Sequence, residues 1–158
     1  EMQSNNIVAS ISKKLHSNCK LLHIPDELDE SAMKTLSQVP EIKTTLEYIK
    51  RTDILVFSIG RADVMAKRRK LPEDKVDEIL SKNAVGEAFG YYFNKDGEIV
   101  YKLNTVGIDL ETVKQVKETI AIFAGTEKVE ALLAISNMHK NMVLVTDEES
   151  AYKILSLL

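Results

Sequence analysis

The stretch Thr119–Lys128 combines a strand, a sharp turn and the start of a helix, and this order restricts the chain to few folds. Residues 120–123 are apolar and predict a buried strand, and Ala-Gly-Thr at 124–126 predicts a turn. Lys128 then opens a predicted helix. Unpaired N–H groups and the helix dipole favour an anion at a helix start, and lysine adds a full positive charge. The stretch therefore predicts a phosphate site, although most short strand-to-helix turns hold no ligand.

The composition is that of an ordinary soluble domain. The chain has 158 residues, enough for one domain with a sizeable core, and 44% of them are hydrophobic and 28% are charged. Its formal net charge of −3 argues against a surface that binds nucleic acid as a whole. No apolar run approaches the ~20 residues of a membrane helix, and no signal peptide is evident. We therefore expect a cytoplasmic protein without a membrane partner.

The sequence offers little to hold a metal or a cofactor. Cys19 is the single cysteine and cannot form an internal disulfide, which fits a reducing compartment. The three histidines are scattered, so a zinc site is not expected. No nucleophile elbow, Walker loop or dinucleotide fingerprint appears. We expect neither a cofactor nor a recognisable catalytic centre.

Two segments of the first half carry the clearest periodic signals. Ile7, Ile11 and Leu15 recur every four positions, so the chain begins with a helix, whereas a Rossmann-like sheet normally opens on a strand. This start is typical of the later part of a larger domain. Residues 53–60 form the clearest strand, and their almost continuous apolar character predicts a central parallel strand covered on both faces.

The alternation of elements predicts the fold class. Asp96-Gly97 lies between two apolar runs and predicts a β-hairpin of residues 89–93 and 98–103. Further strands are expected at 21–24 and 141–146, and further helices at 31–36, from Pro40 onward, and at 61–70, 73–80, 111–117 and 148–157, the last capped by Thr146 or Asp147. This order predicts an α/β fold with a Rossmann-like, mostly parallel sheet, helices on both faces and an inserted β-hairpin.

Two cations near predicted strand ends are candidates for ligand binding, because open α/β sheets bind ligands there. Lys128 follows one strand, and Arg68 lies downstream of the strand that ends at Gly60. Two cations from separate connections would suit a ligand with two anionic groups. The alternative is that the basic run 67–70 is a solvated helical face.

Glu87 is the third polar candidate, in a segment with glycines on both sides of it. Its carboxylate could accept hydrogen bonds from sugar hydroxyls or act as a base. It could equally be a surface glutamate that precedes a strand. The aromatic residues 91–93 of the hairpin are expected to pack or to form an interface rather than to stack on a ligand.

Several motifs, taken in order, resemble the sugar-binding domain of SorC/DeoR-type bacterial transcriptional regulators. They are Ala84–Asn94 with Asp96-Gly97, Val106–Ile108, Ala124–Lys128, and Val143–Glu148 with Ala151. The resemblance implies a fold similar to glucosamine-6-phosphate deaminase and ribose-5-phosphate isomerase, in a protein that is not an enzyme. It implies that Lys128 and Arg68 bind phosphate groups. It also implies that Glu87 binds sugar hydroxyls and that Gln3 contributes to the same pocket.

The resemblance further implies a repressor that forms a homodimer or tetramer and senses a phosphorylated sugar. Binding of the sugar would change the oligomeric state of the repressor and its affinity for operator DNA. In the branch that controls glycolytic genes, the effector is fructose 1,6-bisphosphate. The chain departs from the family in lacking a helix-turn-helix and the Gly/Thr-rich loop of the first part of the effector domain. It also has Ala124 where the family usually has a glycine. We therefore expect residues 1–158 to be a partial effector domain.

Two other functions remain open at this point. The first is a sugar-phosphate isomerase or deaminase of similar fold, with Glu87 as its base, although no second acid or base is evident beside it. The second is an oligomerisation module that uses the aromatic residues of the hairpin.

Overall fold

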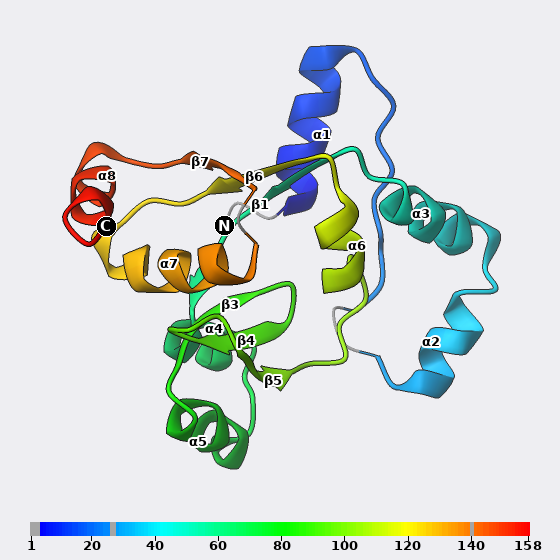
Figure 1. Cartoon of the computed structure of the whole chain (residues 1–158). Coiled ribbons are helices and arrows are strands. Elements are labelled where there is room, and N and C mark those ends of the chain that lie inside the picture. Colours follow the sequence, from blue (N-terminus) through cyan, green and yellow to red (C-terminus); the bar gives the residue numbers. More distant parts are fainter. Residues whose placement is uncertain (1–3, 26–27, 140) are drawn as a thin grey trace.

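The computed structural model describes residues 4–25, 28–139 and 141–158. A parallel sheet and an antiparallel sheet are joined by helices, which confirms the predicted α/β fold (Figure 1). The helices are α1 (Ser4–Leu15), α2 (Glu30–Leu36), α3 (Pro40–Lys50), α4 (Ala62–Arg68), α5 (Glu73–Ser81), α6 (Leu110–Gln115), α7 (Val129–Met138) and α8 (Glu148–Leu155). Within the described ranges, none of them has the length and apolar character needed to cross a bilayer.

The parallel sheet has the order β1 (Ile54–Phe57), β6 (Glu118–Ile122) and β7 (Val143–Val145). β1 is an edge strand of this sheet, so the prediction of a central strand covered on both faces is wrong. Its side chains alternate in burial, and Ile54 and Val56 are 60% and 55% exposed. An apolar run indicates that a strand avoids water, but it does not tell on which sides its neighbours lie.

The antiparallel sheet contains the predicted hairpin and two strands that were not predicted. Its order is β2 (Gly60–Arg61), β3 (Ala84–Ala88), β4 (Tyr91–Asn94) and β5 (Ile99–Lys102). Phe89 and Gly90 both have positive φ, at 58° and 84°, and form a two-residue turn between β3 and β4. Tyr91, Tyr92 and Phe93 are at most 7% exposed. They pack in the core, which removes the basis for an oligomerisation module built on exposed hairpin aromatics.

The segment Leu21–Ile24 does not form the predicted strand. It lies in irregular chain between α1 and α2, and no strand of the described ranges pairs with it. A short segment of this kind gains ladder hydrogen bonds only from a neighbouring strand, so the β propensity of its apolar residues does not by itself create a strand. Of the two predicted caps of the last helix, Asp147 is the one that caps α8, and Asp29 caps α2 by accepting a hydrogen bond from the Ala32 N–H at 2.7 Å.

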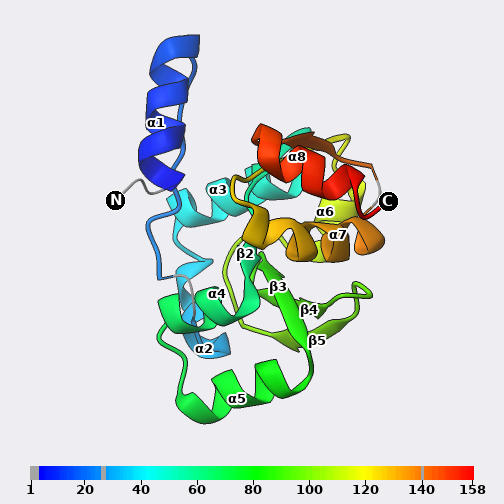
Figure 2. The ribbon, with the colours of Figure 1, turned by 90° about the vertical axis from the view of Figure 1, so that its left-hand side faces the viewer.

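α7 lies between the two sheets (Figure 2), and its buried residues belong to the one of two hydrophobic clusters that includes residues of both sheets. Ile135 of α7 packs in the same cluster as Ala121 of β6 and Phe93 of β4. Gly86 in β3 permits the close approach of α7. A Cβ atom at this position would collide with the Phe93 ring and lie 2.8 Å from the Ala131 Cβ.

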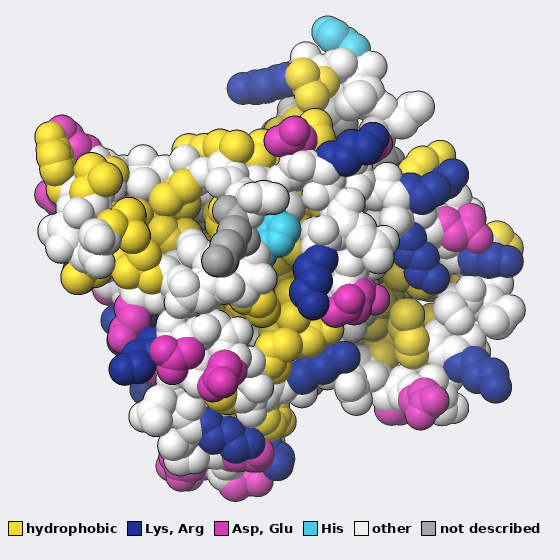
Figure 3. All heavy atoms as spheres, in the orientation of Figure 1, with side chains coloured by type: hydrophobic (Ala, Val, Ile, Leu, Met, Phe, Trp, Pro, Cys, Tyr) yellow, Lys and Arg dark blue, Asp and Glu magenta, His cyan; other side chains and the backbone are white. Residues whose placement is uncertain are grey.

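One face of the parallel sheet carries exposed apolar side chains. Ile122, Val143 and Val145 are 44%, 52% and 48% exposed, and they share this face with Ile54 and Val56. Figure 3 shows hydrophobic side chains gathered along β7 and α8. α1 buries none of its residues. Parallel sheets are normally covered on both faces, so this face is one that another layer of structure would stabilise.

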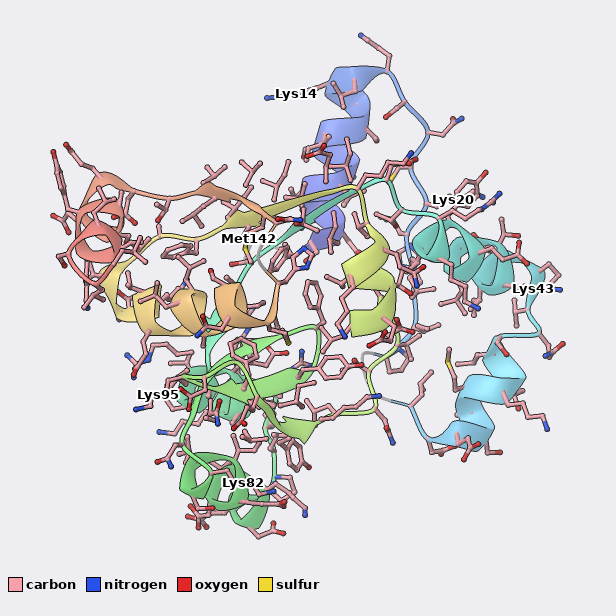
Figure 4. All side chains as sticks on the ribbon, in the orientation of Figure 1. Lys14, Lys20, Lys43, Lys82, Lys95 and Met142 are labelled. Carbon is pink, nitrogen blue, oxygen red and sulfur yellow. The ribbon has the colours of Figure 1, made fainter. Side chains whose placement is uncertain are left out.

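We predict that Gly86→Ala destabilises the fold by about 1–3 kcal/mol, because the added methyl group overpacks the contact between β3 and α7. Unfolding in urea, followed by circular dichroism, measures the change. Lys95→Ala, at an exposed position in the hairpin turn (Figure 4), is the control and should unfold like the wild type. An unchanged midpoint for Gly86→Ala would show that α7 does not depend on this close approach.

Candidate functional site

A pocket of about 400 Å³ opens at the carboxyl ends of the parallel strands β1 and β6. It is lined by residues 58–61, Arg68 of α4, Glu87 of β3, and Glu127 and Lys128. Its size suits a small molecule, and its position is the one at which open α/β sheets bind ligands. The structure thus brings together Arg68, Glu87 and Lys128, which come from three separate segments. Gln3, the fourth predicted residue, lies outside the described residues.

Lys128 reaches the pocket from a short 3₁₀ turn. Thr126–Lys128 form this turn, and α7 begins only after it, so the predicted helix start was one residue too early. Gly125, just before the turn, has a φ of 101°, a value that favours glycine. Ala124 does not have a positive φ, so alanine is accommodated at the position where the family usually has glycine.

Asp147 ties the start of α8 to this turn. Its carboxylate accepts hydrogen bonds from the Ser150 N–H at 2.9 Å, the Ser150 hydroxyl at 2.9 Å and the Gly125 N–H at 2.8 Å. The bonds from Ser150 and then from Gly125 lower the pKa of Asp147 from 3.8 to about 2. The same carboxylate therefore caps a helix and holds the turn that presents Lys128 to the pocket.

The C-terminal end of α4 is fixed by its backbone. Lys70 has a φ of 54°, and its N–H donates to the Lys67 carbonyl at 2.9 Å. The Leu71 N–H donates to the Ala66 carbonyl at 3.2 Å. These two bonds form a Schellman motif, which ends the helix at a defined residue. This fixed backbone also determines the direction in which the side chains of the last turn of α4 point.

The two arginines of this last turn have different surroundings. Arg68 is exposed and lines the pocket, whereas the Arg69 side chain is only 18% exposed and turns toward β3. The interpretation of the run 67–70 as a solvated face is therefore wrong for Arg69. Sequence reasoning missed this residue, although a signal existed. Arg69 follows Ala62 and Ala66 at helical spacing, and both alanines are buried.

Glu87 is a buried residue within β3 and is only 3% exposed. Its Oε1 accepts hydrogen bonds from Arg69 Nη2 at 3.0 Å and from the Gly90 N–H at 2.7 Å. The second oxygen, Oε2, takes part in neither bond. The interpretation as a surface glutamate before a strand is wrong, because Glu87 is buried and lies within β3, a strand that was not predicted. The turn at Phe89 and Gly90 brings the Gly90 amide back onto this carboxylate.

Cations slightly outnumber carboxylates around the pocket. The lining cations are Arg61, Arg68 and Lys128, and the lining carboxylates are Glu87 and Glu127. Arg61 donates to Asp63 from Nη2 at 2.8 Å, and hydrogen bonding to Asp63 raises the pKa of Arg61. Glu87 is paired with Arg69. In the described ranges, no group of three or more histidine, cysteine or acidic side chains could hold a metal ion. The pocket is suited to an anion that also carries hydrogen-bond donors.

Comparison with known proteins shows that the chain is similar to a family of regulators. A family model described as "Putative sugar-binding domain" matches residues 1–156. The central glycolytic genes regulator of Priestia megaterium is 41% identical over 152 residues, which cover 96% of this chain and 44% of that protein. The central glycolytic genes regulator of Bacillus subtilis is 40% identical over 153 residues, which cover 97% of this chain and 45% of that protein. The chain thus spans less than half the length of these relatives.

A solved structure of similar fold is also that of a transcriptional regulator. The crystal structure of a SorC family transcriptional regulator from Enterococcus faecalis superimposes with a TM-score of 0.88 at 36% sequence identity. The match covers 97% of this chain and 62% of that one. The relatives named here are described as regulators.

We predict a pH-dependent loss of stability that runs through Asp147. A carboxyl whose pKa is lowered by folding contributes stability that is fully present above its unfolded pKa, here 3.8, and is lost as the pH falls toward about 2. Asp147→Asn removes the charge at every pH. It should lower the Tm near neutral pH, and its difference from the wild type should shrink as the pH falls through this interval. Thermal unfolding at a series of pH values measures this.

The control for this experiment is Asp96→Asn, at an exposed position of the hairpin turn. It should unfold like the wild type near neutral pH. A Tm difference for Asp147→Asn that stays constant down to the lowest pH would contradict the role given to the ionised carboxylate.

Proposed function

The chain belongs to the sugar-binding domain family of SorC-type bacterial transcriptional regulators, and we propose that its pocket senses fructose 1,6-bisphosphate on behalf of a repressor of glycolytic genes. The observation that carries this proposal is the meeting of Lys128, Arg68 and Glu87 in one pocket. The names of the two relatives at about 40% identity, both central glycolytic genes regulators, support the choice of pathway.

Two cations on separate elements favour a ligand with two phosphate groups. Lys128 follows β6, and Arg68 ends α4, which follows β1 through β2. A charge-assisted hydrogen bond to phosphate is about twice as strong as a neutral one, and each phosphate needs its own partner. A hexose bisphosphate supplies two such groups at the two ends of a sugar. A monophosphate would leave one of the cations without a ligand oxygen.

Glu87 supplies the recognition of the sugar itself. An ionised carboxylate only accepts hydrogen bonds, so it matches the hydroxyl groups of a sugar and repels a phosphate. Its burial in β3 fixes its position, and Oε1 is already held by Arg69 and the Gly90 amide. Oε2 is the oxygen that we assign to the ligand. This division of roles separates a sugar phosphate from inorganic phosphate.

The relatives that match this chain are longer than the chain itself. The chain spans 44% of the relative from Priestia megaterium and 62% of the solved chain from Enterococcus faecalis. We propose that further polypeptide of the same protein closes the open side of the pocket and covers the exposed apolar face of the parallel sheet. In this proposal a helix-turn-helix in the added part binds operator DNA, and effector binding changes the homodimer or tetramer and its hold on DNA.

We predict that Lys128→Ala and Arg68→Ala each weaken binding of fructose 1,6-bisphosphate to the complete protein by about tenfold or more, because each removes a charge-assisted contact with one phosphate. Isothermal titration calorimetry measures the affinity. For fructose 6-phosphate, which lacks one phosphate, one of the two substitutions should have much the smaller effect.

Lys95→Ala is the matched control, because it removes an equal charge from the exposed hairpin turn outside the pocket. It should bind like the wild type. Affinity that is unchanged in both Lys128→Ala and Arg68→Ala would contradict the assignment of the pocket. Turnover of a sugar phosphate in a coupled assay would favour an isomerase or deaminase instead.

A further inference from the structure

A buried carboxylate needs a compensating charge, and Arg69 provides it for Glu87. Glu87 is 3% exposed, and an unpaired charge at that depth is strongly unfavourable. Arg69 Nη2 lies 3.0 Å from Oε1, and the Gly90 N–H lies 2.7 Å from the same oxygen. Both donors therefore bind the same carboxylate oxygen, Oε1. The orientation of Glu87 in the pocket is therefore set by Arg69 and by the turn that contains Gly90.

Hydrogen bonds at the end of α4 restrict the backbone that carries Arg69. Arg69 occupies the position that caps the C-terminal end of α4, and its N–H donates to the Met65 carbonyl at 2.9 Å. The Schellman motif fixes the backbone just beyond it, where Lys70 has a φ of 54°. Consecutive residues of a helix point in different directions, so Arg68 lines the pocket while Arg69 contacts Glu87 from within the protein.

The ion pair is a poor device for stability alone. Arg69 Nε is buried and has no hydrogen-bond partner among the described residues, which is unfavourable in a folded protein. Replacing a buried ion pair by uncharged groups of similar size is often neutral or stabilising. The pair therefore needs another explanation. Its carboxylate faces a pocket, which indicates that the explanation is ligand recognition.

Charge in the pocket supplies that explanation. Without Arg69, the carboxylates of Glu87 and Glu127 would oppose the lining cations and lower the attraction for phosphate groups. With Arg69 beside it, Glu87 contributes hydrogen-bond acceptance with much less repulsion. A polyanionic sugar can then meet a carboxylate at its hydroxyls and cations at its phosphates.

We propose that Arg69 is a positioning residue that orients and neutralises Glu87, so that the pocket accepts the hydroxyls of a doubly phosphorylated sugar. Arg69 acts through Glu87 and need not touch the ligand. This inference rests on the proposed function of the pocket, since it assumes that fructose 1,6-bisphosphate binds there. It assigns a specific role to the one residue of the basic run that points into the protein.

The test is a titration of the complete protein with fructose 1,6-bisphosphate by calorimetry. Arg69→Met should weaken binding by about tenfold or more, because it removes a hydrogen bond between charged groups and leaves Glu87 unpaired. Arg69→Lys keeps the charge and should restore most of the affinity. Lys67→Met, an equal loss of charge at an exposed position of the same helix, should bind like the wild type.

A double-mutant cycle separates this role from a merely structural one. On the background of Glu87→Gln there is no charge to neutralise, so adding Arg69→Met should change the affinity by less than about twofold. The double variant should also be at least as stable as Glu87→Gln in thermal unfolding. This comparison carries the test if Arg69→Met alone does not fold.

Two results would overturn the proposal for Arg69 while leaving the function of the pocket intact. One is wild-type affinity in Arg69→Met, and the other is an equal loss of affinity on the wild-type and Glu87→Gln backgrounds. If the wild-type complete protein does not bind fructose 1,6-bisphosphate, the proposed function fails and this inference fails with it. The wild-type titration therefore distinguishes the two failures.

Discussion

The packing of α7 between the two sheets is the contact on which the pocket depends. Gly86 lets α7 lie directly against β3, and the next residue of that strand is Glu87. Buried residues of α7 also share one hydrophobic cluster with Ala121 of the parallel sheet. The same helix thus sets the distance between the carboxyl ends of β1 and β6 and the strand that carries the buried carboxylate. Lys128 lies directly before α7, so it is placed by the same packing.

Charge placement then determines what the pocket can bind. The backbone at the ends of short elements fixes each charged side chain. The Schellman motif orients the end of α4, the positive φ of Gly90 brings an amide onto Glu87, and Asp147 holds Gly125 before Lys128. Charged groups held by rigid backbone need little reorganisation when a ligand arrives. The result is a pocket that brings the cations Arg68 and Lys128 together with the carboxylate of Glu87.

The local signals of the sequence predicted much of this site. The Asp-Gly turn located β4 and β5, and the strand-turn-helix order placed Lys128 at the end of β6. Periodicity failed where burial comes from long-range packing. β3 is short, contains Gly86 and Glu87, and becomes a strand only because β2 and β4 pair with it. The ion pair between Arg69 and Glu87 was not predicted for the same reason, because without β3 nothing in the sequence indicated that Glu87 is buried.

The sheet order was also outside the reach of sequence patterns. The apolar side chains of β1 predicted a central strand, whereas β6 occupies the centre of the parallel sheet and β1 its edge. Ile54 and Val56 are 60% and 55% exposed, so the apolar character of a strand does not by itself tell whether a neighbouring element covers it.

A crystal structure of the complete protein with fructose 1,6-bisphosphate tests the central claim most directly. The account predicts the ligand in the pocket at the ends of β1 and β6, with one phosphate on Lys128 and the other on Arg68. A sugar hydroxyl should donate to Glu87 Oε2, while Arg69 remains on Oε1. Fructose 1,6-bisphosphate bound elsewhere, or in this pocket with a phosphate rather than a hydroxyl against Glu87, would contradict it.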